Sequence, residues 1–562
     1  MLRLSDLPSD IYVIILSHIP PPNRQQAVLN LSRALPRSPV PTHQIYEHIV
    51  VHTPNAVLNL YHIFRKHRGQ GETPYNPSSQ VQSLSIRTLT PDADLVVNLL
   101  ALLPNVPDLR LSIGTTYGPE HLQDIFANPR LELRRLQLRF RPYVNQATYL
   151  PFLKGAYFDS IITELTKWPA TEHKHLETLS IVQDTISYKT HIKFAQPMAF
   201  FSFKPLIDLA ISPIGQHITS LRLSIPAKTV AQYLYDSPNA FPNLTFLDIS
   251  TTSLPAISPK LSIEHLLSQL VRLQHIVIDR TAGAMPRDTP AWTSFGRTCA
   301  LAGVARAKAR EKVIQEWFEM RRREEVVEQA VNPEQAAVAE RAVRPETRAR
   351  RGRKGLATAT ISLRDPPPQP RSSTAAARSN VDDTTTLNTR RIRIVPSPPT
   401  LRTFSTAYAG PSNPTAQQRI DWTNAFTTGF IGGCQTLNAI WKRMQDSTTS
   451  RVMRFTETDT EPYTADDEDV LTGVADIAVV GHWIGWEPTI PIICFGTERS
   501  VPADGFSRMT VDTGEGDDDN RMSGTIGPSS VGGLWEDEEF VEWGPGHVDG
   551  CGHHIGRSIF ES

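Results

Sequence analysis

The feature that most constrains the fold is a short apolar pattern that recurs along the first half of the chain. Each copy has apolar residues at its first, fourth and sixth positions, as in Val81–Leu84–Ile86. Residues two apart on a β-strand point the same way, so Leu84 and Ile86 would face a common core. Residues 91–103, with leucines at helical spacing, would return the chain over that face. The pattern predicts an α/β fold. The further copies are centred on Leu109, Leu136, Leu179, Leu221, Leu247 and Ile276.

The spacing of these copies resembles that of leucine-rich repeats. Four of the six steps between neighbouring copies fall in or near the family's period of roughly 20–29 residues. The Asn or Cys that the family carries after the last apolar position is absent from every copy. The resemblance implies an irregular leucine-rich-repeat solenoid over residues 47–282, in which stacked units bury a face that one unit cannot bury alone. An ordinary α/β domain with similar buried strands is the alternative.

The start of the chain carries a second pattern. Leu7-Pro8 precedes Ile11, Ile14, Ile15 and Leu16, which recur at helical spacing, and residues 31–35 and 45–46 add two further short matches. This arrangement resembles the F-box, a module of three helices. The resemblance implies that residues 1–46 dock on the Skp-type adaptor of a cullin–RING ubiquitin ligase. The residues implied in adaptor binding are Leu7, Pro8, Ile11, Ile15 and Leu16. The alternative is an amphipathic helix that caps the solenoid.

By this family analogy, the chain would be a non-catalytic substrate-recognition adaptor of a ubiquitin ligase. The alternative is a leucine-rich-repeat scaffold that binds proteins without a link to ubiquitin. The chain has no G-x-S-x-G elbow and no phosphate-binding loop, so an enzyme that uses the C-terminal half is the weakest alternative.

The solvent-facing positions of the predicted strands indicate a partner. Basic side chains are frequent there, and arginine binds carboxylate and phosphate groups in a bidentate manner. The sequence therefore predicts a protein partner that is acidic or phosphorylated. The basic run at 341–354 lacks interleaved aromatic residues, so nucleic acid is not expected as a partner. The predicted partner-binding residues are Arg110, Arg135, Gln137, Arg139 and Arg222.

The remainder of the chain changes composition several times. Residues 283–332 predict a capping helix, and residues 333–418 a disordered linker that is basic and rich in proline. Residues 419–498 predict a short helix and a possible hairpin, weakly folded. Residues 499–562 predict an acidic disordered tail, so that the C-terminal half would be largely disordered. The net charge of −1 hides this division between a basic middle and an acidic end.

Metal and membrane signals are weak. His547, Cys551, His553 and His554 form the one metal-like group of the sequence, but they lie in the predicted disordered tail. A structural zinc site needs four ligands that a folded element positions, so we expect no metal and no cofactor. The four cysteines suggest no disulfide framework, and no apolar run approaches the length of a membrane helix. These signals favour a cytoplasmic or nuclear protein.

Overall fold

The computed structural model describes residues 7–331, 391–407, 414–446, 452–456, 488–496 and 547–561. Within the first range, the gaps are residues 20, 69–76, 115, 141–157, 170–175, 185–198, 201, 227, 236–239, 255–258, 282–285 and 287. The chain folds into two compact units. The first consists of Met1–Gly303, Pro398–Ala439 and Trp486–Ser562, and the second consists of Val304–Ser397 and Ile440–Gly485.

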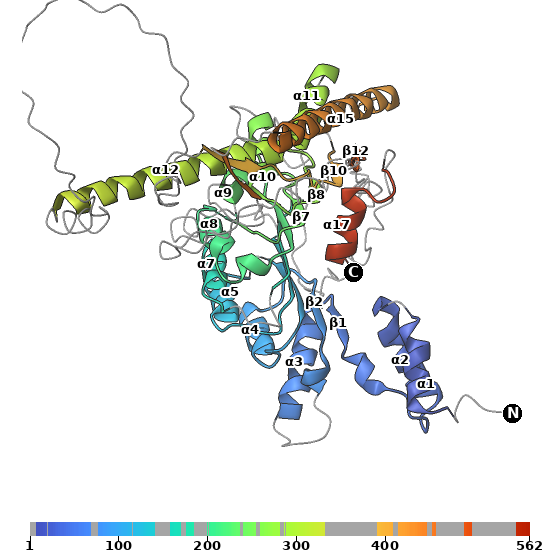
Figure 1. Cartoon of the computed structure of the whole chain (residues 1–562). Helices are drawn as coiled ribbons and strands as arrows, with labels where there is room; N and C mark the ends of the chain where they lie inside the picture. The colour runs from blue at the N-terminus through green and yellow to red at the C-terminus, as the bar shows by residue number, and fades with distance from the viewer. Residues whose placement is uncertain are drawn as a thin grey trace, which may run out of the picture. The chain divides into compact units, whose positions relative to one another are not determined.

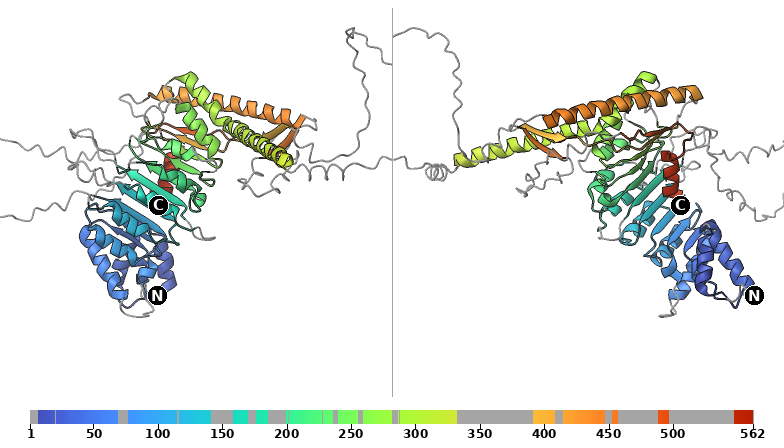
Figure 2. Two further views of the ribbon diagram at one scale, coloured as in Figure 1. Left: turned by 90° about the vertical axis from the view of Figure 1, so that its left-hand side faces the viewer. Right: turned by 45° about the vertical axis from the view of Figure 1, so that its right-hand side comes forward.

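The first unit is built on one sheet of ten parallel strands (Figures 1 and 2). The spatial order of the strands follows the chain, β1-β2-β3-β4-β5-β6-β7-β8-β10-β12. Their bounds are β1 His48–Val51, β2 Ser83–Ile86, β3 Asp108–Ile113, β4 Arg135–Phe140, β5 Thr178–Gln183, β6 Ser220–Ser224, β7 Phe246–Asp248, β8 His275–Val277, β10 Thr403–Ser405 and β12 Ile492–Cys494.

The register of the strands explains why the apolar pattern recurs. One apolar residue from each strand is paired with its neighbours, so that a continuous row crosses the whole sheet from Ile49 on β1 to Ile493 on β12. All members of this row are buried. On β4, Leu136, Leu138 and Phe140 share this buried face, whereas the alternate residues point away from it.

Helices cover that buried face in a row along the sheet (Figure 2). Consecutive helices of the row contact each other, and one continuous core lies between them and the strands. Asp92 caps α4 by accepting the amide hydrogen of Asp94 at 3.0 Å. The row consists of α3 Pro54–Arg68, α4 Ala93–Ala101, α5 Pro119–Phe126, α7 Ser160–Thr166, α8 Pro205–Ile211, α9 Ala231–Tyr235, α10 Pro259–Gln269 and α11 Thr289–Ala300. Short 3-10 turns lie at η3 Pro77–Gln80 and η4 Gly215–His217.

The N-terminal residues form a small helical cluster with a core of its own. Helices α1 (Ser9–Ser17) and α2 (Pro21–Ala34) enclose Tyr12, Leu16 and Val28. The turn η2 (Thr42–Ile45) then leads directly into β1 of the sheet. The third helix that the F-box resemblance implies is therefore reduced to one 3-10 turn.

Segments from the C-terminal half of the chain complete the sheet beyond β8. β10 pairs with β8, which lies 128 residues earlier in the chain, and β12 pairs with β10, which lies 89 residues earlier. Helix α15 (Ala416–Asp446) places Trp422 against Trp292 of α11, with ring centroids 6.1 Å apart. Helix α17 (Gly552–Glu561) contacts β8 and β10 on the face opposite the helical row.

The second unit is smaller. Its two-stranded parallel sheet joins β9 (Arg391–Val395) to β11 (Val452–Thr456). The long helix α12 (Ala302–Val331) contributes Glu311, which accepts a hydrogen bond from Arg393 at 2.7 Å. The indole nitrogen of the buried Trp441 donates to the Pro396 carbonyl at 2.8 Å.

These observations correct the predicted architecture. The α/β class is right, but an F-box-like module followed by a leucine-rich-repeat solenoid is wrong. Most of the predicted linker and of the predicted tail lies outside the described residues. The structure has one ten-stranded parallel sheet, and the C-terminal half supplies β10, β12, α17 and most of α15 to the same unit. The physical reason is that the edge of β8 would otherwise expose unpaired backbone groups. β10, which pairs with that edge, has only three residues and is too short to give an alternating apolar signal in the sequence.

The predicted helix over 283–332 is interrupted in the structure. Asp288 caps α11 by accepting the amide hydrogen of Ala291 at 2.7 Å, and α11 ends at Ala300. Among the described helices, none combines the length and the apolar composition that crossing a bilayer requires.

Candidate functional site

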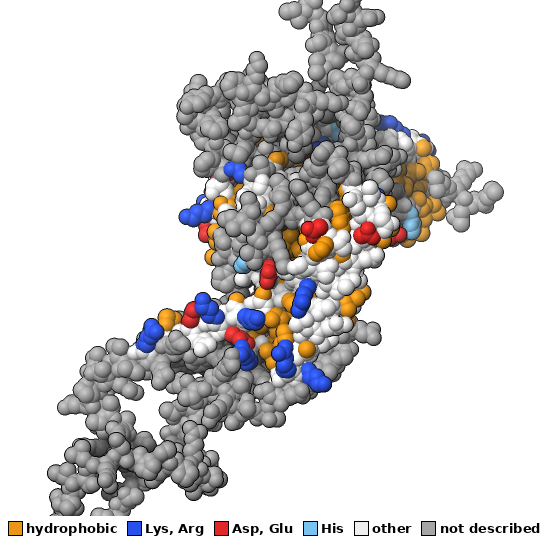
Figure 3. Space-filling model, turned by 90° about the horizontal axis from the view of Figure 1, so that it is seen from above, with side chains coloured by type: hydrophobic (Ala, Val, Ile, Leu, Met, Phe, Trp, Pro, Cys, Tyr) orange, Lys and Arg blue, Asp and Glu red, His pale blue; other side chains and the backbone are white. Residues whose placement is uncertain are grey.

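The sheet has a second face, which the row of helices leaves uncovered. We call it the strand face and define it by one register row, Arg110, Gln137, Ser180, Arg222, Asp248, Val277, Ser405 and Cys494. All of the predicted partner-binding residues lie on it. Figure 3 views the molecule from above rather than onto this face, and on the described surface that it shows, basic, acidic and apolar side chains are interspersed.

Carboxylates of the same chain pair with each arginine of the predicted partner-binding set. Asp108 is buried and lies 3.1 Å from Arg110 and 3.0 Å from Arg135. Asp184 pairs with Arg139 at 2.8 Å, and Asp248 pairs with Arg222 at 2.7 Å. The predicted basic stretch is therefore a row of ion pairs, and Arg139, whose side chain is 68% exposed, is the member most accessible to a partner.

Helix α17 lies along the strand face and uses several of the same residues. The side-chain amide of Gln137 donates to the Phe560 carbonyl at 2.6 Å, and Arg110 donates to the Glu561 carbonyl at 3.5 Å. These donors satisfy carbonyls that the last turn of a helix leaves without partners. The guanidinium of Arg222 lies over the Phe560 ring at 4.2 Å. The chain's own C-terminal helix thus occupies part of the predicted partner site.

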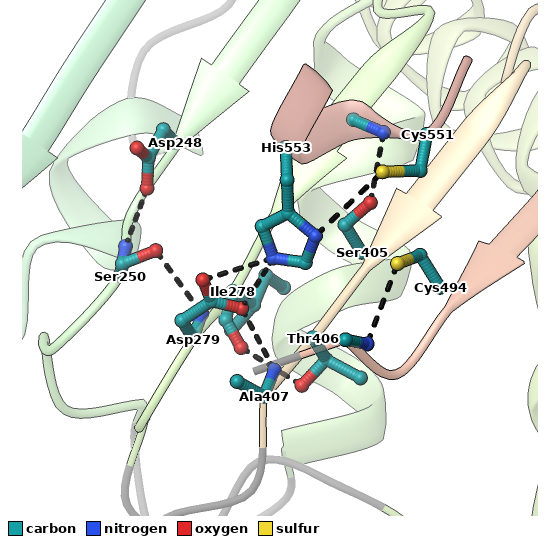
Figure 4. Close-up of polar contacts among 12 residues, drawn as sticks. Asp248, Ser250, Ile278, Asp279, Ser405, Thr406, Ala407, Cys494, Cys551 and His553 are labelled. Atoms are coloured by element: carbon teal, nitrogen blue, oxygen red, sulfur yellow. Dashed lines mark hydrogen bonds and ion pairs between the residues drawn. The ribbon is translucent and has the colours of Figure 1, made fainter. Parts of the chain in front are cut away.

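A cluster of cysteine and histidine side chains lies where α17 begins (Figure 4). Cys494 ends β12, His547 precedes a turn, and Cys551 and His553 lie at the start of α17. One donor atom from each side chain lies within 4.8 Å of all the others. We call these four residues the Cys/His cluster.

The individual distances in the cluster are short. The Nδ1 atom of His547 lies 3.7 Å from the sulfur of Cys494 and 3.8 Å from that of Cys551. The Nδ1 atom of His553 lies 3.9 Å from the Cys551 sulfur. Both sulfur atoms are thiols rather than halves of a disulfide. Cys494, Cys551 and His553 are buried, and His547 is half-buried.

A carboxylate outside the cluster orients one of its histidines. The Nε2 atom of His553 lies 2.9 Å from both carboxylate oxygens of Asp279, so its Nδ1 atom turns toward the thiols (Figure 4). The amide of Ala407 donates to Asp279 at 2.7 Å and holds the carboxylate in place. On the other side, the Gly552 amide donates to the Ser405 hydroxyl at 2.9 Å and joins α17 to β10.

The surroundings shift the pKa values of the two thiols in opposite directions. Their mutual hydrogen bond raises the pKa of Cys494 to about 12, and burial acts in the same direction. The same hydrogen bond lowers the pKa of Cys551, although burial opposes it. Burial alone would lower the pKa of His553, but its hydrogen bonds to Asp279 and the thiols raise it. A thiolate at Cys551 is the form of cysteine that binds metals.

The donor set determines what this arrangement can do chemically. Two cysteines and two histidines are a common ligand set for tetrahedral zinc, and a carboxylate behind a ligating histidine is its usual support. All four positions would be filled by protein, which suits a structural ion rather than a catalytic one.

The predicted adaptor-binding residues fall into two groups. Leu16 is fully buried and presents no side chain to a partner, whereas Leu7 is partly buried against the N-terminal core. Pro8, Ile11 and Ile15 are exposed. Ile14, which was not in the predicted set, is the most exposed of the isoleucines in α1.

The sequence located only part of the Cys/His cluster. Three of its members were recognised, but Cys494 and the supporting Asp279 were missed, and the exposed His554 was included in error. No motif spacing links Cys494 to residues 547–553, because 52 residues separate it from His547. The prediction of no metal site rested on a disordered tail, and that premise is wrong for residues 547–561.

Comparisons with known proteins do not assign the chain to a family. No protein-family model matches the chain. A search of curated proteins also found no significant match. The function must therefore be argued from the described residues themselves.

Proposed function

We propose that this protein is a non-catalytic recognition subunit of a cullin–RING ubiquitin ligase. In this proposal, α1 binds a Skp-type adaptor and the strand face binds a protein substrate. The observation that carries the proposal is the exposed apolar stripe of α1, which we define as Ile11, Ile14 and Ile15. Their exposed fractions are 38%, 54% and 41%.

The stripe is not a by-product of a loosely packed helix. Tyr12 and Leu16, on an adjacent side of α1, are fully buried in the N-terminal core. Positions 11, 14 and 15 fall on one side of a helix, because residues three and four apart are neighbours on its surface. Contiguous exposed apolar side chains favour a protein-interaction site, whereas single ones are common and carry no such meaning.

The helical cluster is also joined to the sheet, as an adaptor-binding module that positions a substrate would require. The side chain of Gln25 on α2 donates to the Ile45 carbonyl at 3.2 Å. Arg24 lies 3.7 Å from Glu47, which directly precedes β1. These contacts connect α2 to the first strand, so the apolar stripe and the strand face belong to one unit.

The strand face supports a protein partner rather than a small molecule. Its charged side chains lie on β3, β4, β6 and β7, and with Ser180 of β5 the polar row extends across five neighbouring strands. Arg139 and Arg135 retain the most exposure among the predicted partner-binding residues, with Arg135 at 36%. An acidic or phosphorylated segment would exchange the ion pairs of these arginines for its own carboxylate or phosphate groups.

Capture of a purified Skp-type adaptor by the full chain tests the proposal. The variant is the triple substitution Ile11→Ser, Ile14→Ser and Ile15→Ser. Each half-exposed isoleucine would contribute about 1 kcal/mol on burial, so the three together should weaken binding about 100-fold. Titration calorimetry or surface plasmon resonance measures the change.

A matched control uses exposed apolar residues elsewhere in the same unit. Ile211 and Leu131 are 52% and 49% exposed, and their substitution by Ser should leave capture unchanged. If the wild-type chain is folded and does not bind the adaptor, the ligase role is refuted. The protein would then be a recognition scaffold that acts without a link to ubiquitin.

A further inference from the structure

We propose that Cys494, His547, Cys551 and His553 bind one Zn²⁺ ion that fastens α17 to the strand face. The four donors come from three places in the chain, namely the end of β12, a turn, and the first residues of α17. Folding therefore brings together the ligands, and the site exists only in the folded unit. The inference stands independently of the proposed ligase role.

The spacing of the donors fits a tetrahedral zinc ion. Zn–S bonds of about 2.3 Å and Zn–N bonds of about 2.0–2.1 Å place sulfur and nitrogen ligands about 3.6 Å apart. The sulfur–nitrogen distances of the cluster are 3.7, 3.8 and 3.9 Å. All donor pairs lie within 4.8 Å, so the remaining pairs would have to close by at most about 1 Å to give regular coordination. Thiolate and imidazole donors in this geometry favour zinc over the oxygen-seeking ions calcium and magnesium.

The surroundings of the cluster match those of a ligand set. Asp279 receives the Nε2 hydrogen of His553, which leaves Nδ1 to face the ion. The amide of Gly496 points at the Cys494 sulfur at 3.4 Å, and such a donor would support the thiolate that a bound ion requires. Within the described residues, this is the one group of at least three Cys, His, Asp or Glu side chains that converges in this way.

A disulfide between Cys494 and Cys551 would explain less of the geometry. It would account for the two sulfur atoms but not for the two imidazoles directed at them. It would also not account for the carboxylate that orients His553. Ordinary core cysteines are represented by Cys299 and Cys434, which are buried on α11 and α15. They provide the internal comparison.

The consequence for the fold concerns α17. Two of the ligands occupy its first turn and the residue before it, and the rest of the helix continues over Phe246 and Arg222. An ion bound to both β12 and α17 would fix one end of this helix to the sheet edge. The occupancy of the metal site would thus determine how much of the strand face is open to a partner.

The experiment measures metal content and geometry in the full chain. The protein is purified without added metal, treated with chelator, and then titrated with Zn²⁺ or Co²⁺. We expect one zinc per chain by elemental analysis. The cobalt form should show the intense visible bands of a tetrahedral site together with thiolate-to-cobalt charge transfer.

Two pairs of variants make the assignment specific. His553→Ala should abolish the cobalt spectrum, whereas His554→Ala, which changes the neighbouring exposed residue, should retain it. Cys551→Ala should lose zinc, whereas Cys434→Ala should retain one ion per chain. Asp279→Asn keeps all four ligands and should weaken zinc binding about 10–100-fold without changing the cobalt bands.

Three results would overturn the inference. One is a folded wild-type chain that binds neither ion after reconstitution. Another is a Cys494–Cys551 disulfide in the protein purified under reducing conditions. The third is equal loss of zinc in Cys551→Ala and Cys434→Ala, because that would place the ion elsewhere.

Discussion

The two ends of the described chain carry helices that differ in what covers their apolar side chains. Helix α1 buries Tyr12 and Leu16 within its own cluster but leaves three isoleucines exposed. Helix α17 buries Phe560 against Phe246, with ring centroids 5.6 Å apart. The apolar side of α17 is thus satisfied within the chain, whereas one side of α1 remains open.

This difference separates two roles that helices at opposite ends of a chain can have. The partner of α17 is the strand face, and its attachment includes side-chain donors, an aromatic contact and the Cys/His cluster. The exposed stripe of α1 has the composition of an interface but contributes little to its own cluster. We therefore expect substitutions in α17 to change the fold locally, and substitutions in the stripe to change only binding.

The largest effect on the attachment of α17 is expected when the proposed metal ligands are replaced. In the full chain with Cys494→Ser and Cys551→Ser, we expect α17 to detach while the rest of the sheet stays folded. The effect should be the largest of the set, because structural zinc contributes on the order of 10 kcal/mol of binding free energy to a folded state. Hydrogen exchange of residues 552–561 measures the detachment, and Cys434→Ala serves as the control. Unchanged protection of α17 would show that the helix does not depend on the cluster.

The second test compares the two sides of α1. Leu16→Ala removes a fully buried side chain and should lower the free energy of unfolding of the N-terminal cluster by about 2–5 kcal/mol. Ile14→Ala changes a side chain that is 54% exposed, so its effect should lie within about 0.5 kcal/mol. Hydrogen exchange of residues 9–34 reports both values. Similar destabilisation by the two substitutions would mean that the stripe is part of the cluster's core.

The third test removes the aromatic contact of α17. Phe560→Ala should weaken the attachment of the helix by about 3 kcal/mol, because Phe560 is buried between Phe246 and Arg222. Ser558→Ala changes an exposed residue of the same helix and should have little effect. Proteolysis at the C-terminus, compared between these variants, would reveal the loosened helix. Equal cleavage rates would argue against packing as the source of attachment.

The smallest effect is expected at Gly556, where two contributions oppose each other. A Cβ atom there would lie 2.8 Å from the Phe246 ring, and such overpacking costs about 1–3 kcal/mol. Replacing glycine by alanine in a helix gains about 1 kcal/mol. Gly556→Ala should therefore weaken attachment by about 1 kcal/mol while helix content by circular dichroism stays constant. Tighter attachment would show that Phe246 can move aside.

The sequence predicted the strands better than their assembly. Leu84, Leu136 and Leu221 all lie at buried strand positions, as predicted. The prediction succeeded because alternation of apolar and polar residues identifies the face of a strand that is buried. The strand β10 was missed, since three residues cannot show an alternating pattern, and β12 lies in the predicted hairpin region but pairs in parallel with β10. Their pairing depends on the exposed edge of β8, which is a property of the assembled sheet.

At the candidate sites, too, the positions of residues were predicted better than their contacts. The apolar stripe of α1 could be recognised from helical spacing, but that spacing did not separate the buried Leu16 from the exposed Ile14. The strand-face arginines were located correctly, but their ion pairs with Asp108, Asp184 and Asp248 were not predicted. Apart from the Asp108–Arg110 pair within β3, these pairs join neighbouring strands or a strand and a loop, so they depend on register.

The amino-acid sequence by itself determined the α/β class, the positions of the central strands and an amphipathic N-terminal helix. These follow from periodicities that are local in the chain. Only the tertiary structure decided that Cys494 meets His547, Cys551 and His553, and that α17 covers part of the strand face. Contacts of that kind depend on which distant segments satisfy an open sheet edge, and no local pattern of residues encodes that choice.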